Sequence, residues 1–361
     1  MKKCCVNCFE SQYLNQIISR SSNSGNCDYC LSKNVWTYSP KELSIFFRGI
    51  IDLYEIDKEK GLPIEEQLII DFPQKVFSPK VTKKTKELIR EILIDDIDYY
   101  EKILNNPVRL RLQESEIEEV IIKPLSSSWD KFSEEIKTIN RFHLVNELDL
   151  EKFKSLFKYF EKHLSKQQLF YRARICYDGK GYPQEKMGNP PAYLAKAGRA
   201  NPEGISYLYL ANDVETTLYE IRSSLFDYVS VGTFKIKEEI GKDQKADKDL
   251  KVVNLSSDTY DLFYLAEKDS LEEVLMHRPF TDKLEKELSK PRRKSDSELD
   301  YLPTQYLSEL IKSMGFDGIE YQSSLHSGGY NIVVFNPEKF ICTESKLYEI
   351  ESTHLGYKEI K

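Results

Sequence analysis

The chain has 361 residues, which suits two or three units at about 100 to 200 residues per domain. Its 40% hydrophobic and 12% aromatic content excludes an intrinsically disordered protein. Its net charge of −7 argues against binding to nucleic acid. Apolar runs such as Ile332 to Phe335 are far shorter than the roughly 20 residues that span a bilayer. The start lacks a signal-peptide core, so we expect a soluble, cytoplasmic protein without a membrane partner.

The first thirty residues contain five of the seven cysteines. Cys5-x-x-Cys8 and Cys27-x-x-Cys30 are two pairs with the spacing of a ribbon that closes on one tetrahedral Zn²⁺. Cys4 can replace Cys5 in this pattern, and the alternative is a set of buried thiols without metal. Four thiolates leave no open coordination position, so the expected zinc is structural. We predict a zinc ribbon over residues 1–38.

A helical pattern follows the cysteines. Ser39-Pro40-Lys41-Glu42 has the form of a capping box with proline at the first helical position. Apolar residues then recur at helical spacing in several stretches, the last of which ends at Leu164. We predict an all-helical domain over residues 39–165.

The pattern changes after Lys166, where short β-rich runs alternate with helices. The runs are Leu169–Ile175, Val229–Ile236, Lys251–Leu255 and Asn331–Phe335. The segment from Tyr177 to Gly204 is rich in glycine and proline, which predicts a long loop. We predict a third domain over residues 166–350, and an α+β fold class for the chain.

Two arginines stand in the first of these strands. The two-residue period of a strand places Arg172 and Arg174 on one face and Tyr171 on the other. Paired guanidinium groups suit the bidentate capture of a pyrophosphate. The alternative is a pair of surface arginines on an edge strand, and these residues alone do not decide between the two.

A second group of candidate residues follows the loop. A turn-rich segment contains Arg199 and Asn201, and in the strand after it Tyr207 and Tyr209 share a face by alternation. The next helix starts at Val214, after Asn212 or Asp213 as its cap, with Leu218, Ile221 and Leu225 as its buried stripe. Glu220 lies at the border of that stripe. By itself such a carboxylate is more often an ordinary solvated helix residue.

Together these residues resemble the RES family, which is named for an arginine, a glutamate and a serine. A further block, in the runs Tyr301–Tyr306, Gly315–Ser323 and Asn331–Asn336, completes the resemblance in order and spacing. The resemblance implies an α/β core similar to that of ADP-ribosylating toxins and an enzyme that consumes NAD.

The resemblance also implies roles for single residues. The catalytic set is Glu220, Tyr209, Arg199 and Ser323, with Ser324 as an alternative to Ser323. The NAD-binding set is Arg172, Arg174, Tyr171, Tyr207, Asn201 and Asn331. Arg172 and Arg199 are assigned to the phosphates, and Tyr209 to the nicotinamide or its ribose.

The expected chemistry is cleavage of the nicotinamide–ribose bond of NAD. This reaction passes through an oxocarbenium-like state that a carboxylate such as Glu220 stabilises. Water as acceptor makes the enzyme a glycohydrolase and phosphate makes it a phosphorylase, in either case as a toxin or an antiviral defence effector. The alternatives are an ADP-ribosyltransferase that modifies a protein and a sensor that binds NAD or ADP-ribose without turnover.

The N-terminal half resembles modules found ahead of RES domains and grouped with HEPN-associated regions. None of the histidines follows an arginine at the four to six residues that a HEPN ribonuclease shows, so no ribonuclease activity is predicted. We expect this half to dock a regulatory or antitoxin protein, and the alternative is that the ribbon reads nucleic acid. The sequence leaves the oligomeric state open and is compatible with a homo-oligomer.

Overall fold

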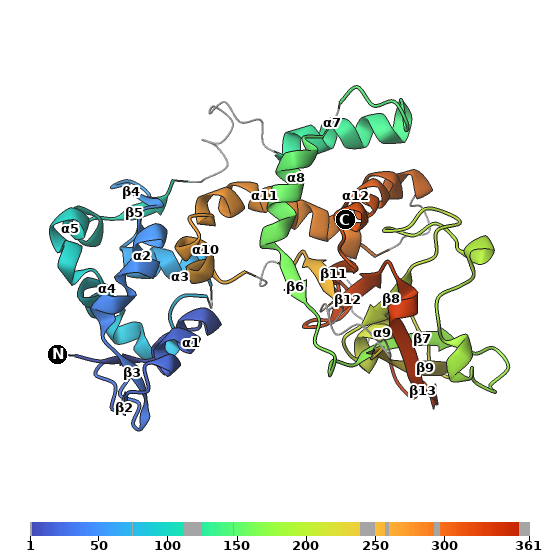
Figure 1. Ribbon diagram of the computed structural model, residues 1–361, viewed down its shortest axis with the longest axis horizontal. Helices are drawn as coiled ribbons and strands as arrows, with labels where there is room; N and C mark the ends of the chain where they lie inside the picture. Colours follow the sequence, from blue (N-terminus) through green and yellow to red (C-terminus); the bar gives the residue numbers. More distant parts are fainter. Residues whose placement is uncertain are drawn as a thin grey trace, which may run out of the picture. The chain divides into compact units, whose positions relative to one another are not determined.

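The computed structural model describes residues 2–73, 75–111, 125–146, 148–238, 250–256, 260–291 and 297–353, which form two compact units (Figure 1). Unit 1 consists of Met1–Pro124 and Tyr260–Arg278, and unit 2 consists of Leu125–Thr259 and Pro279–Lys361. Helix α11 (Leu271–Ser289) belongs to both units, which divide at its internal Pro279. The division into three domains stays a prediction beside this arrangement of two units.

The N-terminal part of unit 1 is a small sheet with one helix. Strands β1 (Cys4–Cys5), β3 (Val35–Tyr38) and β2 (Ser24–Gly25) pair in the order β1-β3-β2. Helix α1 (Gln12–Arg20) begins after Ser11, whose side chain accepts a hydrogen bond from the backbone N–H of Leu14. Such a cap satisfies one of the free N–H groups of the first turn.

The rest of unit 1 is mainly helical, whereas the sequence predicted an all-helical segment. The helices are α2 (Ser44–Ile51), α3 (Ile64–Asp71), α4 (Thr85–Ile92) and α5 (Ile97–Asn105). Two short strands are exceptions, since β4 (Tyr54–Ile56) pairs with β5 (Val108–Leu110). The capping box at Ser39 does not form, because the N–H of Glu42 donates to the backbone oxygen of Ser39 in a 3₁₀ turn (Pro40–Leu43).

Unit 1 also contains helix α10 (Leu262–Glu267), which lies far along the chain, within the predicted third domain. The rings of Phe47 on α2 and Phe263 on α10 have centroids 4.8 Å apart. A Cβ added at Gly49 would lie 3.1 Å from the Cβ of Ala266, so the two helices approach closely. Residues 260–278 are therefore part of the core of unit 1.

Unit 2 is built on an eight-stranded mixed sheet in the order β13-β9-β7-β8-β12-β11-β10-β6 (Figure 1). Its strands are β6 (Glu161–His163), β7 (Phe170–Ile175), β8 (Leu208–Ala211), β9 (Tyr228–Ile236), β10 (Lys251–Asn254), β11 (Gly318–Gln322), β12 (Tyr330–Val334) and β13 (Phe340–Glu349). Among these described strands, only β10 and β11 pair in parallel. Its helices are α7 (Leu125–Thr138), α8 (Leu150–Tyr159), α9 (Val214–Glu220), the second part of α11, and α12 (Leu302–Ser313). The α+β fold class is confirmed, and the four predicted β runs agree with β7, β9, β10 and β12 to within one residue at each end.

The sheet buries apolar side chains on both faces. On the first, which we call the loop face, Phe170, Leu208 and Ile332 pack with Met187 of the long loop. On the second, the α9 face, Ala173 and Val231 pack with Leu218 and Ile221 at helix α9. Since side chains alternate along a strand, each position in β7, β8 and β12 is assigned to one face or the other. This assignment decides which of the predicted residues can meet.

Helix α9 is shorter than the predicted buried stripe requires. It ends at Glu220, and Arg222 has the left-handed backbone conformation, with φ of 54°. Leu225, predicted to be buried, is therefore beyond the helix and 47% exposed. Among the described residues, no helix has both the length and the apolar character needed to cross a bilayer.

Candidate active site

A cavity opens where strands β7 and β8 separate. The two strands share one residue pair, Tyr171 with Ala211. Beyond it, the backbone N–H of Ala173 donates to Oγ1 of Thr217 on α9, at 2.8 Å, instead of to a strand. The cavity has a volume of about 300 Å³. It is lined by Arg172, Ala173, Tyr209, Leu210, Ala211, Thr217, Glu220, Ile221, Tyr321 and Asn331.

A second cavity, of about 440 Å³, adjoins the first. Both are lined by Tyr209, Glu220 and Tyr321. The second differs in carrying three cationic side chains, from Arg199, Arg222 and Lys290. Glu220 therefore lies between a mainly apolar and aromatic cavity and a cationic one.

The carboxylate of Glu220 is held by two side chains. Its Oε1 accepts hydrogen bonds from Oγ of Ser323 and from Nδ2 of Asn331, each at 2.7 Å. Glu220 is the last residue of α9, where the negative end of the helix dipole disfavours an anion. The two donors offset that effect, and they place Oε1 in one position.

The structure distinguishes the two candidate serines. Ser323 donates to Glu220, and its Oγ also accepts from the backbone N–H groups of Leu325 and His326, at 3.2 and 3.3 Å. Ser324 instead donates to the backbone oxygen of Ser289, at 2.5 Å. Of the pair, Ser323 is the one that contacts the carboxylate.

Tyr209 lies on the α9 face with its hydroxyl fixed. It donates to Oδ1 of Asn201 at 2.6 Å. The amide of Asn201 in turn donates to the backbone oxygens of Lys196, Pro202 and Ile205. Burial raises the pKa of Tyr209 well above its ordinary value, so the phenol stays protonated. The predicted NAD-binding residue Asn201 thus holds the turn and Tyr209 in place.

Arg199 is positioned by helix α12. Its guanidinium donates to the backbone oxygen of Glu287 at 3.0 Å and lies over the ring of Tyr301, 5.0 Å from the centroid. Its own backbone oxygen accepts from Oγ1 of Thr304, while Nε2 of Gln305 donates to the oxygens of Gly198 and Asn201. Residues of the Tyr301–Tyr306 block therefore hold the turn that contains Arg199.

The guanidinium groups of the other predicted arginines form their hydrogen bonds on the loop face, although Arg172 is also among the residues that line the first cavity. Arg172 and Arg174 share the loop face, where their guanidinium groups donate to backbone oxygens of Met187 and Gly188 and of Lys186, respectively. Burial and the charge of Arg174 lower the pKa of Arg172 to about 10. The shared face agrees with the alternation argument. The structure nevertheless does not bring these two guanidinium groups together with Glu220.

Two of the tyrosines predicted to bind NAD, Tyr171 and Tyr207, lie away from the two cavities at Glu220. Tyr171 packs against the core of the α9 face. Tyr207 comes before β8 begins, and its ring packs on Phe335 with centroids 4.9 Å apart. Neither residue is among the described lining of the two cavities.

Sequence reasoning missed three residues of the site. Tyr321 lines both cavities, and its position in a β-rich run two residues before Ser323 was an available signal. Burial raises its pKa. Arg222 and Lys290 follow the ends of α9 and α11, and no sequence pattern assigned them to the site.

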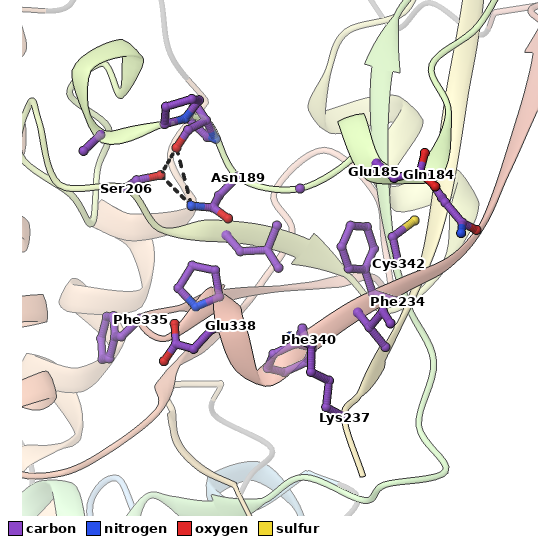
Figure 2. A pocket seen from close by; sticks show the side chains of 17 residues that line it. Gln184, Glu185, Asn189, Ser206, Phe234, Lys237, Phe335, Glu338, Phe340 and Cys342 are labelled. Atoms are coloured by element: carbon purple, nitrogen blue, oxygen red, sulfur yellow. Dashed lines mark hydrogen bonds between the residues drawn. The ribbon is translucent and has the colours of Figure 1, made fainter. Parts of the chain in front are cut away.

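A third cavity, of about 780 Å³, lies on the loop face (Figure 2). Phe234, Phe335 and Phe340 line it, with Asn189 and Ser206 on its opposite side (Figure 2). The amide of Asn189 donates to Oγ of Ser206, which itself donates to the backbone oxygen of Pro190. Its described lining includes none of the predicted catalytic residues, so we place the candidate chemistry at Glu220.

The N-terminal cysteines fit a zinc site. Sγ of Cys5 lies 3.9 Å from that of Cys8 and 3.4 Å from that of Cys30, and Cys8 lies 3.4 Å from Cys27. Four ligands at a Zn–S distance of about 2.3 Å are roughly 3.8 Å apart in a tetrahedron. Cys4 instead donates to the backbone oxygen of Tyr38. The geometry therefore selects Cys5 over Cys4, and zinc at these four thiols is a proposal that the donor set supports.

Comparison with known proteins bears on unit 2. The RES domain family model matches residues 169–346. A structurally similar chain comes from the M. tuberculosis MbcT-MbcA toxin-antitoxin complex, with 12% sequence identity and a TM-score of 0.32, over 55% of this chain and 92% of that chain. No curated protein matches the chain. The chain thus carries a RES domain over residues 169–346.

Proposed function

We propose that the RES domain cleaves the bond between nicotinamide and ribose in NAD. The observation that carries this proposal is the position of Glu220, between an aromatic cavity and a cationic one, with its Oε1 bound by Ser323 and Asn331. NAD has a matching polarity, since its positively charged nicotinamide and its pyrophosphate lie on opposite sides of a ribose.

The aromatic cavity suits the nicotinamide and its ribose. Tyr209 and Tyr321 both line it. A cationic ring beside an aromatic face gains about 0.5 to 2 kcal/mol. The fixed hydroxyl of Tyr209 keeps its ring in one orientation.

The cationic cavity suits the pyrophosphate. Arg199, Arg222 and Lys290 line it. Arginine binds phosphate oxygens through paired N–H donors, and lysine adds a compact charge. We assign the pyrophosphate to Arg199 first. The assignment of Arg172 and Arg174 to NAD is the alternative, and the second pair of variants below tests it for Arg172.

The proposed step is electrostatic stabilisation of an oxocarbenium-like state. As the bond from nicotinamide nitrogen to C1 of the ribose lengthens, positive charge develops on the ribose. Both hydrogen bonds to the Glu220 carboxylate fall on Oε1, so we assign Oε2 to the ribose. A carboxylate held in advance stabilises this charge without reorganising during the reaction.

Water or phosphate as the final acceptor makes the enzyme a glycohydrolase or a phosphorylase. We favour these acceptors over a protein side chain, and a toxin or defence role over a housekeeping one, since unrestrained loss of NAD kills a cell. For the same reason we propose that an antitoxin or regulatory protein binds the chain and restrains its activity. A sensor that binds NAD without turnover is the second candidate, because the same two cavities could bind the dinucleotide.

The two adjacent serines offer a matched test of this geometry. Ser323→Ala removes one of two donors to Glu220 and is expected to lower kcat for NAD cleavage by roughly 10-fold to 100-fold. Ser324→Ala removes only a bond to a backbone oxygen and should leave kcat within a factor of about three. Steady-state kinetics with NAD measures both. Equal effects of the two substitutions would contradict the assignment of Ser323.

The arginines offer a second matched pair. Arg199→Ala is expected to raise KM for NAD by about tenfold or more, because a charge-assisted bond contributes about 1.5 to 3 kcal/mol. Arg172→Ala removes the donor that holds Met187 and Gly188, so it should lower the melting temperature rather than raise KM. An increase in KM for Arg172→Ala at an unchanged melting temperature would place the pyrophosphate near Arg172 instead.

A further inference from the structure

The sheet of unit 2 ends in two very different edge strands. β6 has 3 residues, whereas β13 has 10. Among the described residues, no strand pairs with the outer side of β13. Edge strands are usually short, covered or interrupted, because their unpaired N–H and C=O groups can pair with another chain. The long edge β13 needs a physical explanation.

The side chains of β13 are exposed as well. Ile341, Leu347 and Tyr348 are 47, 44 and 41% exposed, although large apolar residues are usually buried. The register with β9 shifts between Cys342 and Glu344, so a bulge ends the regular part of the strand on one side. The regular, exposed segment is therefore Glu344–Glu349, which we call the β13 edge.

The charges on the β13 edge are complementary to a reversed copy of the same segment. Glu344 and Lys346 lie two residues apart, so they share a face, and in one protomer they form an ion pair at 2.8 Å. In antiparallel pairing between two copies around a two-fold axis, opposed residues also share a face. Only registers that oppose residues of the same face are therefore allowed.

The charged residues that lie opposite each other differ between these registers, and this difference favours one of them. With the axis at Ser345, Glu344 of each copy lies opposite Lys346 of the other, which gives two cross-strand ion pairs. With the axis at Lys346, two like charges lie opposite each other, and with the axis at Leu347, Lys346 lies opposite Tyr348. Opposite charges facing across strands stabilise a sheet, and like charges destabilise it.

We propose that a second copy of this chain pairs antiparallel with the β13 edge, on a two-fold axis at Ser345. Regular pairing then covers Glu344–Lys346 of each copy, because the residues beyond Lys346 oppose the bulge, and it joins the sheets of two RES domains. Ser345 is held in the strand by its Oγ, which donates to the backbone oxygen of Tyr182 at 2.7 Å, so the position on the axis is ordered before pairing. This interaction surface is independent of the proposed chemistry at Glu220.

Cross-linking tests the register. In Ser345→Cys the two thiols of a dimer lie directly opposite each other, within reach of a disulfide. In the control Leu347→Cys the two thiols are separated by four residues along the strands, roughly 14 Å, which is too far. Non-reducing electrophoresis of the full chain after mild oxidation, with peptide mapping by mass spectrometry, should show a covalent dimer through residue 345 only. Equal cross-linking at both positions, or none at 345, overturns the register.

Charge exchange tests the pairing without a covalent bond. Lys346→Glu and Glu344→Lys should each raise the dimer dissociation constant by about tenfold, because each turns two opposed pairs into like charges. The double variant should return it to within about threefold of the original. Lys154→Glu is the control, since it breaks the exposed ion pair of Lys154 with Glu151 on α8. Sedimentation equilibrium over a range of concentrations measures all four, and a wild-type chain that stays monomeric, or a dimer that the single variants leave unchanged, overturns the proposal.

Discussion

Replacing Glu220 by glutamine is expected to lower the rate of NAD cleavage by about 10³-fold or more while leaving the melting temperature nearly unchanged. Glutamine keeps the size of the side chain and can still accept the bonds from Ser323 and Asn331 through its carbonyl oxygen. It removes the negative charge that would face the ribose. A loss of rate at unchanged stability therefore reports on the charge and not on the packing of α9.

A second carboxylate provides the control for this prediction. Glu338 lines the larger cavity on the loop face, which has none of the proposed machinery among its described lining. Glu338→Gln should leave the rate within about twofold, since a surface substitution away from the reacting atoms has little effect. If Glu338→Gln lowers the rate as much as Glu220→Gln, the chemistry belongs to the cavity of Figure 2 and our assignment is wrong.

Removal of the zinc ligands is the prediction with the largest expected effect on stability. Cys27→Ser combined with Cys30→Ser deletes half of the four-thiol cluster. A structural zinc site contributes on the order of 10 kcal/mol to folding, and the strands of sheet β1-β3-β2 have only 2, 4 and 2 residues. We expect the zinc content, measured by metal analysis, to fall from one zinc per chain to none. In thermal unfolding, the transition of the N-terminal part should be lost.

The neighbouring Cys4 makes the zinc test specific. Its thiol donates to the oxygen of Tyr38, which a serine hydroxyl can also do. Cys4→Ser should therefore retain one zinc per chain. If the wild-type protein contains no metal and is only as stable as the double variant, the zinc proposal is wrong and the four thiols are a buried cluster without metal.

The sequence predicted those features that depend on local periodicity. Alternation in Phe170–Ile175 and Asn331–Phe335 placed two strands, and C-x-x-C spacing placed four thiols in one cluster. The helix that carries Glu220 was also expected from its apolar spacing. The catalytic roles came from the resemblance, and they stay predictions until they are tested.

Features that depend on long-range contacts were not predictable. Glu220 and Asn331 meet because β12 pairs with β8 beside α9, which no local pattern encodes. The guanidinium groups of Arg172 and Arg174 face the loop side because of the order of the strands. The place of α10 in unit 1 depends on the packing of Phe263 against Phe47, across a long separation in the chain.

This packing also decides which protein should be assayed. A fragment that starts at residue 166 keeps α10 but removes α2, its packing partner in unit 1. It would expose Leu262, Phe263 and Leu265, which are buried in the full chain. Exposed apolar surface of this kind favours aggregation, so activity is best measured on the full chain.

The most direct test is to incubate the purified full chain with NAD, with and without phosphate, and to resolve the products by liquid chromatography and mass spectrometry, with Glu220→Gln in parallel. Our account predicts free nicotinamide from the wild-type chain and almost none from the variant. ADP-ribose as the second product identifies hydrolysis, and a phosphorylated ADP-ribose that forms only with phosphate identifies phosphorolysis. Intact NAD that nevertheless binds to the wild-type chain would contradict cleavage and favour the sensor.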